Sequence, residues 1–250
     1  MAGAAVLGRL TWLVADVVDL VQESATARSV VLDVPGWPGH LAGQHVDIRV
    51  TAPDGYSARR SYSVASAPDR SRVTLTVQLV SDGEVSPYLV EELRRGDQLE
   101  LRGPIGGWFV WRPEQVERVL LVAGGSGVVP LMSMARTRAV AGRAAPMRLL
   151  YSTRDQASAM FLDELRELAA GADGLGVYLA WTRRAPDGST RAPGRIDGEL
   201  LARAGWRPDL RPTCYVCGPT GFVETVADLL VAAGHEAGRI RTERFGPTGG

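Results

Sequence analysis

Arg60, Ser61, Tyr62 and Ser63 form a run of side chains that suits a ligand carrying both a phosphate and a flat ring. A guanidinium binds a phosphate through two parallel hydrogen bonds, and a tyrosine ring stacks on a planar ring system. The serine hydroxyls add hydrogen-bonding groups beside that ring. A strand edge with an outward-facing arginine would show the same residues, so the run alone leaves both interpretations open.

A glycine-rich turn farther along the chain suits a second phosphate-bearing ligand. Gly125, Ser126 and Gly127 follow a continuous apolar run and precede an apolar segment with helical character. In that context, glycine lets a phosphate approach the backbone at the start of a helix. Turns after parallel strands also carry glycine for backbone geometry alone, so this interpretation has a structural alternative.

Cys217, Gly218 and Pro219 close the last apolar run before the C-terminal helix. Ligands of doubly wound α/β folds bind at the carboxyl ends of the strands, which makes this stretch another candidate. The alternative is that Cys217 is a small buried apolar residue. Cys214 is the other cysteine, and we expect no disulfide, because residues three apart on a strand point to opposite faces.

Composition limits the functions that the chain can have. The 250 residues carry no net charge, which argues against a nucleic-acid partner. Two cysteines and three scattered histidines give no ligand set for zinc or an iron–sulfur cluster, so we expect no metal. No apolar run is long enough to span a bilayer, and residues 1–7 lack the features of a signal peptide. We therefore expect a cytoplasmic protein without a membrane span.

The segments that must position these residues are of two types. Up to residue 113, short alternating runs such as 44–50 and 73–80 are separated by Gly, Pro and Asp turns, which predicts a sandwich or a small barrel of strands. One helix is expected over 86–93, with Ser86 as its N-cap and Pro87 at its first position.

From residue 114 onward, apolar strands alternate with helices, which predicts a doubly wound parallel sheet. The length also favours two domains, which we place at 1–113 and 114–250. The expected strands of the second domain are 118–123, 147–151, 177–181 and 214–217, and the expected helices are 130–141, 160–170, 198–204 and 221–233.

In chain order, the run 60–63, the turn 124–127 and the stretch 217–219 resemble the ferredoxin–NADP reductase family. Residues 103–109 are also similar to the turn with which that family leaves its flavin domain. The resemblance implies an FAD-dependent NAD(P)H oxidoreductase without a fused iron–sulfur domain. The implied fold is a six-stranded antiparallel β-barrel that binds flavin, followed by a doubly wound α/β domain that binds a nicotinamide dinucleotide.

The resemblance also implies a set of flavin contacts. Residues 82–86 stand where FAD-binding members hold the pyrophosphate at a helix N-terminus, which favours FAD over FMN. Glu243 and Phe245 stand where members carry a glutamate and a terminal aromatic that covers the flavin. Because residues 246–250 follow, the extent to which Phe245 stacks is left open. The expected FAD-binding residues are Arg60, Ser61, Tyr62, Ser63, Gln78, Leu79, Gly83, Val85, Ser86 and Phe245.

For the dinucleotide, the same resemblance favours NADPH over NADH. Thr182 and Arg183 stand where NADP-specific members carry Ser-Arg, and no acid occupies position 182 to bind a free ribose hydroxyl. Solvated surface arginines remain the alternative. The expected NADP-binding residues are Gly125, Ser126, Gly127, Ser152, Arg154, Thr182, Arg183, Arg195, Cys217, Gly218 and Pro219.

The implied reaction passes a hydride from NAD(P)H to FAD, with Ser63, Cys217 and Glu243 as the catalytic residues. Electrons would then go singly to a separate acceptor: a ferredoxin, a flavodoxin or an oxygenase component. One alternative is the NADH-dependent reductase component of a multicomponent oxygenase. Another is a non-catalytic flavin-binding interaction subunit, which the presence of all three catalytic residues disfavours.

Overall fold

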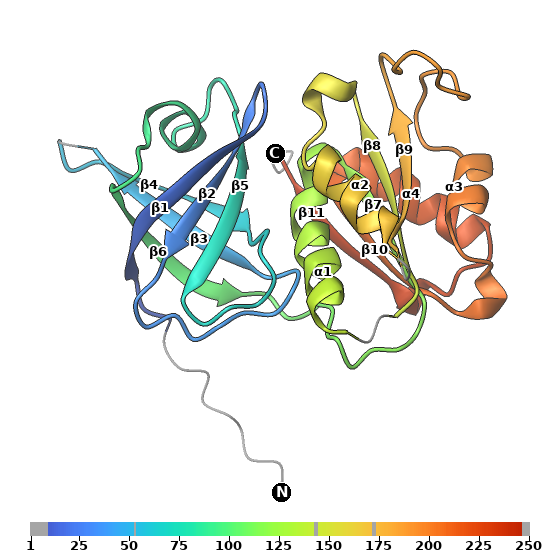
Figure 1. Ribbon diagram of the computed structural model, residues 1–250, viewed down its shortest axis with the longest axis horizontal. Coiled ribbons are helices and arrows are strands. Elements are labelled where there is room, and N and C mark those ends of the chain that lie inside the picture. The colour runs from blue at the N-terminus through green and yellow to red at the C-terminus, as the bar shows by residue number, and fades with distance from the viewer. Residues whose placement is uncertain (1–9, 53, 143–144, 172–173, 247–250) are drawn as a thin grey trace, which may run out of the picture.

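The computed structural model describes residues 10–52, 54–142, 145–171 and 174–246. Residues 1–7, to which the signal-peptide argument applied, lie outside these ranges. Two sheets stand side by side, an antiparallel one on the left of Figure 1 and a helix-flanked parallel one on the right. No helix in the described ranges is long and apolar enough to cross a membrane.

The first sheet is the predicted six-stranded antiparallel barrel. Its strands are β1 (Leu13–Ser24), β2 (Ala27–Asp33), β3 (His45–Thr51), β4 (Ser57–Ser63), β5 (Arg72–Gln78) and β6 (Gln98–Ile105). Their order is β4-β3-β6-β1-β2-β5, and a bridge between Val64 and Leu75 joins the two outer strands. Alternating apolar residues fill the interior, as the period of two required. They include Val30, Leu32, Val46, Ile48, Val73, Leu75 and Leu101.

The predicted helix over 86–93 is present over residues 86–92: Ser86 and Pro87 are helical, and the π-helix η1, Tyr88–Glu92, follows them directly. The predicted N-cap at Ser86 is wrong: Ser86 already lies inside the helix, and no side chain caps η1, which Pro87 directly precedes. The Ser86 hydroxyl instead accepts a hydrogen bond from the Val80 amide at 3.0 Å and closes the loop before the helix. Pro87 has helical dihedral angles already, so the chain begins the turn without a serine cap.

The second sheet is parallel and doubly wound, as predicted. Its strands are β7 (Val119–Gly124), β8 (Met147–Thr153), β9 (Gly176–Trp181), β10 (Thr213–Pro219) and β11 (Ile240–Phe245). The helices are α1 (Val128–Val140), α2 (Leu162–Ala170), α3 (Gly198–Ala204) and α4 (Thr220–Ala232), with 3₁₀ turns η2 (Gly125–Gly127), η3 (Gln156–Ser158), η4 (Pro208–Leu210) and η5 (Ala237–Arg239). The order β11-β10-β7-β8-β9 puts the switch point of the fold between β7 and β10.

Helices cover both faces of this sheet, which is why β7 is apolar on both sides. Leu121 and Ala123 pack with α1 and α2, whereas Leu120 and Val122 pack with α3 and α4. The two cysteines of β10 follow the same alternation, with Cys217 in the first cluster and Cys214 in the second. Both are buried free thiols, and they lie on opposite faces of the sheet, as the expectation of no disulfide assumed.

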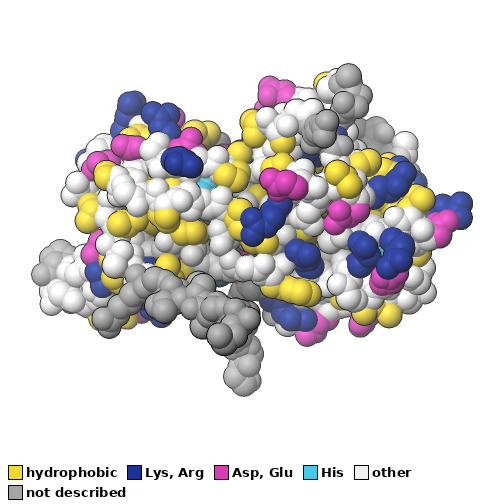
Figure 2. Space-filling view, turned by 90° about the horizontal axis from the view of Figure 1, so that it is seen from below, with side chains coloured by type: hydrophobic (Ala, Val, Ile, Leu, Met, Phe, Trp, Pro, Cys, Tyr) yellow, Lys and Arg dark blue, Asp and Glu magenta, His cyan; other side chains and the backbone are white. Residues whose placement is uncertain are grey.

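The last barrel strand ends at Ile105 and the first strand of the parallel sheet begins at Val119. The domain boundary after residue 113 remains a prediction. On the face seen in Figure 2, basic and acidic side chains of the described residues are interspersed, with no broad area of one sign. That distribution is unlike the basic stripe of a nucleic-acid-binding surface.

Candidate functional site

The two domains meet where β4 ends. Ser63 is the last residue of β4, and its hydroxyl donates a hydrogen bond of 3.4 Å to Oε1 of Glu243, 180 residues later on β11. Glu243 lies opposite Cys217 in the parallel register of β10 and β11. Because paired residues of neighbouring strands point to the same face, the three predicted catalytic residues lie at one place on the domain interface.

Burial sets the protonation of two of these groups. It raises the pKa of Glu243 to about 7, although the hydrogen bond from Ser63 acts in the opposite direction. Burial also raises the pKa of the Cys217 thiol well above its ordinary value, and the nearby Glu243 carboxylate adds to that effect. Cys217 is therefore a buried, neutral thiol rather than a nucleophile, because nucleophilic attack needs the thiolate. Glu243 can hold or release a proton near neutral pH.

The side chains of β4 alternate between two sides. Tyr62 is paired with Val46 and Arg60 with Ile48, so both project to the side of the barrel core. Tyr62 packs partly buried against that core, and burial raises its pKa to about 12, which keeps its hydroxyl protonated. Ser61 projects to the opposite side, where its hydroxyl donates to Asp47 at 2.7 Å. The Ser61 side chain thus does not join Tyr62, and only its backbone is left for the predicted flavin contact.

Arg60 has an ion-pair partner that the sequence did not suggest. Its guanidinium pairs with Glu84, which also accepts a hydrogen bond of 2.5 Å from the Tyr56 hydroxyl. Both members of the ion pair are about half exposed, at 52% for Arg60 and 44% for Glu84. Exposed pairs contribute little to stability, so a phosphate could take the place of Glu84 at low cost. The Arg60 guanidinium therefore fits a phosphate ligand that would replace the Glu84 carboxylate as its ion-pair partner.

The remaining predicted flavin residues surround the loop between β5 and η1. Gln78 lines the cleft between the domains, and the Leu79 amide donates to the Thr26 carbonyl at 2.8 Å. Val85 is fully buried in the barrel core, which leaves its backbone for contacts. A Cβ on Gly83 would lie 2.9 Å from the Ser86 hydroxyl, so this loop needs glycine to close.

A cleft of about 260 Å³ lies between Gln78 of the barrel and the carboxyl edge of the parallel sheet. Phe245, which is 37% exposed, forms part of its wall. Predicted residues that line it are Gln78, Gly125, Ser126, Ser152, Arg154, Thr182, Pro219 and Phe245. The cleft is also lined by Gly124 of the predicted turn 124–127, and by four residues outside the expected binding set: Thr26, Thr153, Ser158 and Phe222.

The glycine turn has two different requirements for glycine. A Cβ on Gly127 would lie 2.1 Å from the carbonyl oxygen of Cys217, so the turn touches β10 too closely for any side chain. Gly125 has φ +55°, and a Cβ there would meet nothing within 4 Å. Backbone in the left-handed region beside open space leaves room for a phosphate to approach, so the turn fits the group that it is predicted to bind.

A second cavity of about 700 Å³ continues along the ends of β8, β9 and β10. Its lining includes Ser152, Arg154, Thr182, Arg183, Arg195 and Pro219, all of which the sequence predicted. Among the described residues that line it there are three arginines and no carboxylate. The cavity shares Ser152, Arg154, Thr182, Pro219 and Phe222 with the interdomain cleft, so the two form one trough.

Phe222 is the missed residue with the clearest structural role. A Cβ on Gly218 would lie 2.6 Å from its ring, and one on Gly124 would lie 2.7 Å from it. Both glycines therefore admit the Phe222 ring between the ends of β7 and β10. The sequence signal that could have identified Phe222 is its position: an aromatic residue in the first turn of the helix that follows Cys-Gly-Pro.

Comparisons with known proteins agree with this architecture. Residues 16–110 match the Oxidoreductase FAD-binding domain family, and residues 121–228 match the Oxidoreductase NAD-binding domain family. Ferredoxin–NADP reductase B of Sorangium cellulosum is 37% identical over 193 residues, covering 75% of this chain and 78% of that protein. The FAD/NAD-binding domain of a nitric oxide dioxygenase from Vibrio cholerae has a TM-score of 0.84 at 27% identity, covering 94% of this chain and 99% of that chain.

The ferredoxin reductase component of a 3-ketosteroid-9-alpha-monooxygenase from Mycolicibacterium smegmatis is 32% identical over 238 residues. The match covers 92% of this chain and 64% of that protein, so the chain spans less than two thirds of that relative's length. With the two sheets and both domain matches, the chain is a two-domain flavoprotein oxidoreductase. It belongs to the ferredoxin–NADP reductase-like family, with one domain of the FAD-binding type and one of the NAD-binding type.

Proposed function

We propose that this protein transfers a hydride from NADPH to bound FAD and then passes single electrons to a separate protein acceptor. The observation that carries the proposal is the contact between Ser63 and Glu243 across the domain interface, with Cys217 paired to Glu243 in the parallel sheet. When bound, FAD supplies the hydride-accepting and one-electron chemistry that amino-acid side chains lack. The protein's own contribution is binding, orientation and the placement of a proton.

On the flavin side, Tyr62 would cover one face of the ring and Phe245 would lie near the other. Arg60, released from Glu84, would bind the pyrophosphate together with backbone groups of residues 83–86. Ser63 would turn its single hydroxyl proton to the ring edge, while the Ser63 oxygen accepts a hydrogen bond from the protonated Glu243 carboxyl, which orients it. Since the pKa of Glu243 is raised to about 7, its carboxyl can also exchange a proton through that hydroxyl near neutral pH.

On the dinucleotide side, the turn Gly125–Gly127 would bind the pyrophosphate, and Cys217 and Pro219 would line the nicotinamide pocket. The three arginines of the outer cavity support NADPH, because a 2′-phosphate needs cationic partners where NAD enzymes place a carboxylate. The Thr182 hydroxyl already donates its proton to the Thr153 carbonyl at 3.2 Å, so it has none left to donate to the phosphate. The 2′-phosphate would therefore be bound by Arg154, Arg183 and Arg195.

Two measurements test this function. The purified protein should show the visible absorbance of a bound flavin, and anaerobic NADPH should bleach it. Arg183→Ala should raise the KM for NADPH by about 10-fold while changing the KM for NADH by less than about twofold, as expected for the loss of one charged contact. Arg184→Ala is the matched control, since Arg184 is the next residue and is not among those that line the cavity. Equal effects of Arg183→Ala on both cofactors would contradict the preference for NADPH.

The second candidate is the NADH-dependent reductase component of an oxygenase, which the Mycolicibacterium smegmatis relative favours. In both cases the acceptor would be a ferredoxin, a flavodoxin or an oxygenase component. The ratio of kcat/KM for NADPH to that for NADH separates the two candidates. A purified protein without flavin absorbance would instead support the non-catalytic interaction subunit. We propose the cytoplasm as the compartment, in keeping with two free thiols.

A further inference from the structure

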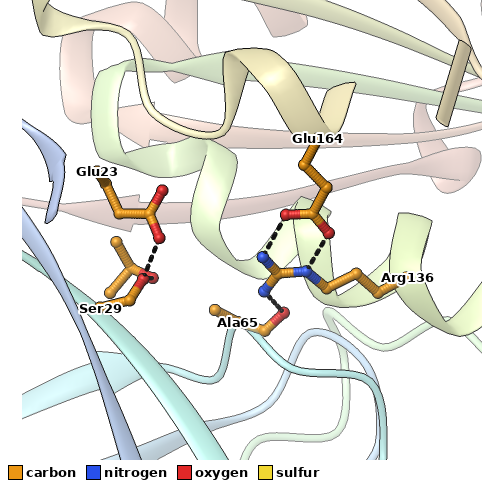
Figure 3. Close-up of polar contacts among 6 residues, drawn as sticks. Glu23, Ser29, Ala65, Arg136 and Glu164 are labelled. Carbon is orange, nitrogen blue, oxygen red and sulfur yellow. Dashed lines mark hydrogen bonds and ion pairs between the residues drawn. The ribbon is translucent and has the colours of Figure 1, made fainter. Parts of the chain in front are cut away.

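A second cleft separates the two domains on the side of α1 and α2. It encloses about 680 Å³ between β1, β2 and β5 of the barrel and residues 156–166 of the other domain. Some of its polar groups pair within one wall: Ser29 donates to Glu23 at 2.6 Å on the barrel side, as Figure 3 shows, and Arg166 pairs with Asp163 on the other side. Polar groups that are already hydrogen-bonded leave little for a ligand to bind, so we interpret this cleft as a boundary between the domains and call it the seam.

Arg136 of α1 joins the two walls at the floor of this seam (Figure 3). Its Nε and Nη2 donate to the two carboxylate oxygens of Glu164 on α2 at 2.7 and 2.6 Å. Its Nη1 donates to the carbonyl of Ala65, in the barrel domain, at 2.8 Å. The guanidinium also lies 5.0 Å from the centre of the Phe161 ring. A planar cation held at three donors and one face has a fixed orientation.

Ser133 makes a parallel connection one turn earlier on α1. It is fully buried, and its hydroxyl donates to the Ser66 carbonyl at 2.6 Å. We call these two connections, from Arg136 to Ala65 and from Ser133 to Ser66, the α1 clasp. Ala65 and Ser66 follow Ser63 closely in the chain, and α1 begins directly after the turn Gly125–Gly127. The clasp therefore links the strand that would hold the flavin ring to the turn that would hold the dinucleotide.

We propose that Arg136 is a positioning residue that sets the approach of the nicotinamide to the flavin, an inference that rests on the proposed function. Hydride transfer requires the two rings at near-attack distance, and displacement by one ångström is costly. α1 belongs to the dinucleotide domain, and its hydrogen bonds to residues 65 and 66 fix how that domain lies relative to Tyr62 and Ser63. Glu164 holds the guanidinium in the orientation that reaches Ala65.

The clasp is tested by comparing Arg136→Ala and Arg136→Lys with the wild type. In anaerobic stopped-flow experiments, the limiting rate of flavin reduction at saturating NADPH should fall roughly 10- to 100-fold in Arg136→Ala, the range that such misplacement produces. The Kd for NADP⁺ should change by less than about twofold, because Arg136 lines neither cavity of the trough in which the dinucleotide would bind. Arg136→Lys keeps the charge but not the fork, so its rate should lie between the two.

The matched control is Arg166→Gln. Arg166 lines the same cleft but pairs with Asp163 of its own helix, so its removal should leave the limiting rate within about twofold of the wild type. A limiting rate in Arg136→Lys equal to that of the wild type, or an equal loss in Arg166→Gln, would overturn the proposal. Arg136→Lys also serves if Arg136→Ala does not fold.

A second readout does not depend on catalysis. Hydrogen–deuterium exchange over residues 65–76 should speed up in Arg136→Lys, because the segment after β4 loses a tie to α1. Exchange unchanged in these residues would refute the clasp even if the enzyme were slower. A wild-type protein that NADPH does not reduce would refute the proposed function, and the exchange result would still report on the clasp.

Discussion

Glu243 is a carboxyl group whose environment gives its protonation a measurable consequence. Its ordinary pKa is 4.5, and burial raises the pKa in the folded protein to about 7. Between these values the folded state binds a proton that the unfolded chain has lost, so stability falls as the pH rises through this window. Below pH 4.5 the group is neutral in both states, so it causes no further change of the unfolding free energy with pH.

Glu243→Gln removes this proton linkage while keeping a side chain of similar shape. Relative to that variant, the wild type should lose on the order of 3 kcal/mol of unfolding free energy between about pH 4.5 and 7, and no more above that range. Urea unfolding of both proteins at several pH values measures the difference. A difference that does not vary with pH would show that Glu243 ionises as freely in the folded protein as in the unfolded chain.

At the scale of elements, the two glycines of the turn Gly125–Gly127 have different roles: Gly127 allows close packing against β10, and Gly125 leaves open space for a ligand. Gly127→Ala would push a methyl group against the Cys217 carbonyl and should cost about 1–3 kcal/mol of stability, because a backbone oxygen in a sheet cannot move aside. Gly125→Ala should cost about 1 kcal/mol for its left-handed backbone but weaken NADP⁺ binding more, because its methyl would occupy the open space. Thermal unfolding and NADP⁺ titration of the two variants should therefore rank them in opposite orders.

The elements were largely predictable because their signals are local. An uninterrupted apolar run identified β7, and α3 begins and ends where its pattern indicated. The N-cap prediction failed because it considered only the helix: the Ser86 hydroxyl bonds to the backbone of Val80, six residues earlier in the folded loop, rather than to its own helix. Alternation along β4 could have separated Ser61 from Tyr62, since the two differ by one residue.

The candidate site was predictable where a motif carries it and not elsewhere. Arg154 and Arg183 of the outer cavity follow the ends of β8 and β9, so topology predicted their place, whereas Arg195 was predicted only from the family resemblance. Thr26 and Ser158 reach the cleft from turns in different domains, and no local pattern links them to it. The Arg60–Glu84 pair joins residues 24 apart through a loop, which composition and spacing do not describe. Contacts between loops depend on the assembled fold rather than on neighbouring residues.

For the molecule as a whole, the contact between domains extends beyond the site to the segment that joins them. The Val110 carbonyl accepts two hydrogen bonds from the parallel sheet, one from the Tyr215 hydroxyl and one from Arg241, each at 2.9 Å. Arg241 also donates to the Trp108 carbonyl at 3.2 Å. The connecting segment is thus fixed to β10 and β11, and the second domain holds the chain that leaves the barrel.

The double variant Tyr215→Phe with Arg241→Met should loosen the two domains from each other. It leaves the Val110 carbonyl, on a buried residue, without either donor, and an unpaired buried acceptor costs about 1–3 kcal/mol. Each single variant should cost less than half of that, because the other donor remains, so the two effects should be more than additive. Calorimetry should show a lower transition temperature and a broader transition, because the domains unfold less cooperatively. Tyr178→Phe on β9, on the far side of the sheet from the barrel, is the control; a double variant no less stable than that control would mean that this segment does not couple the domains.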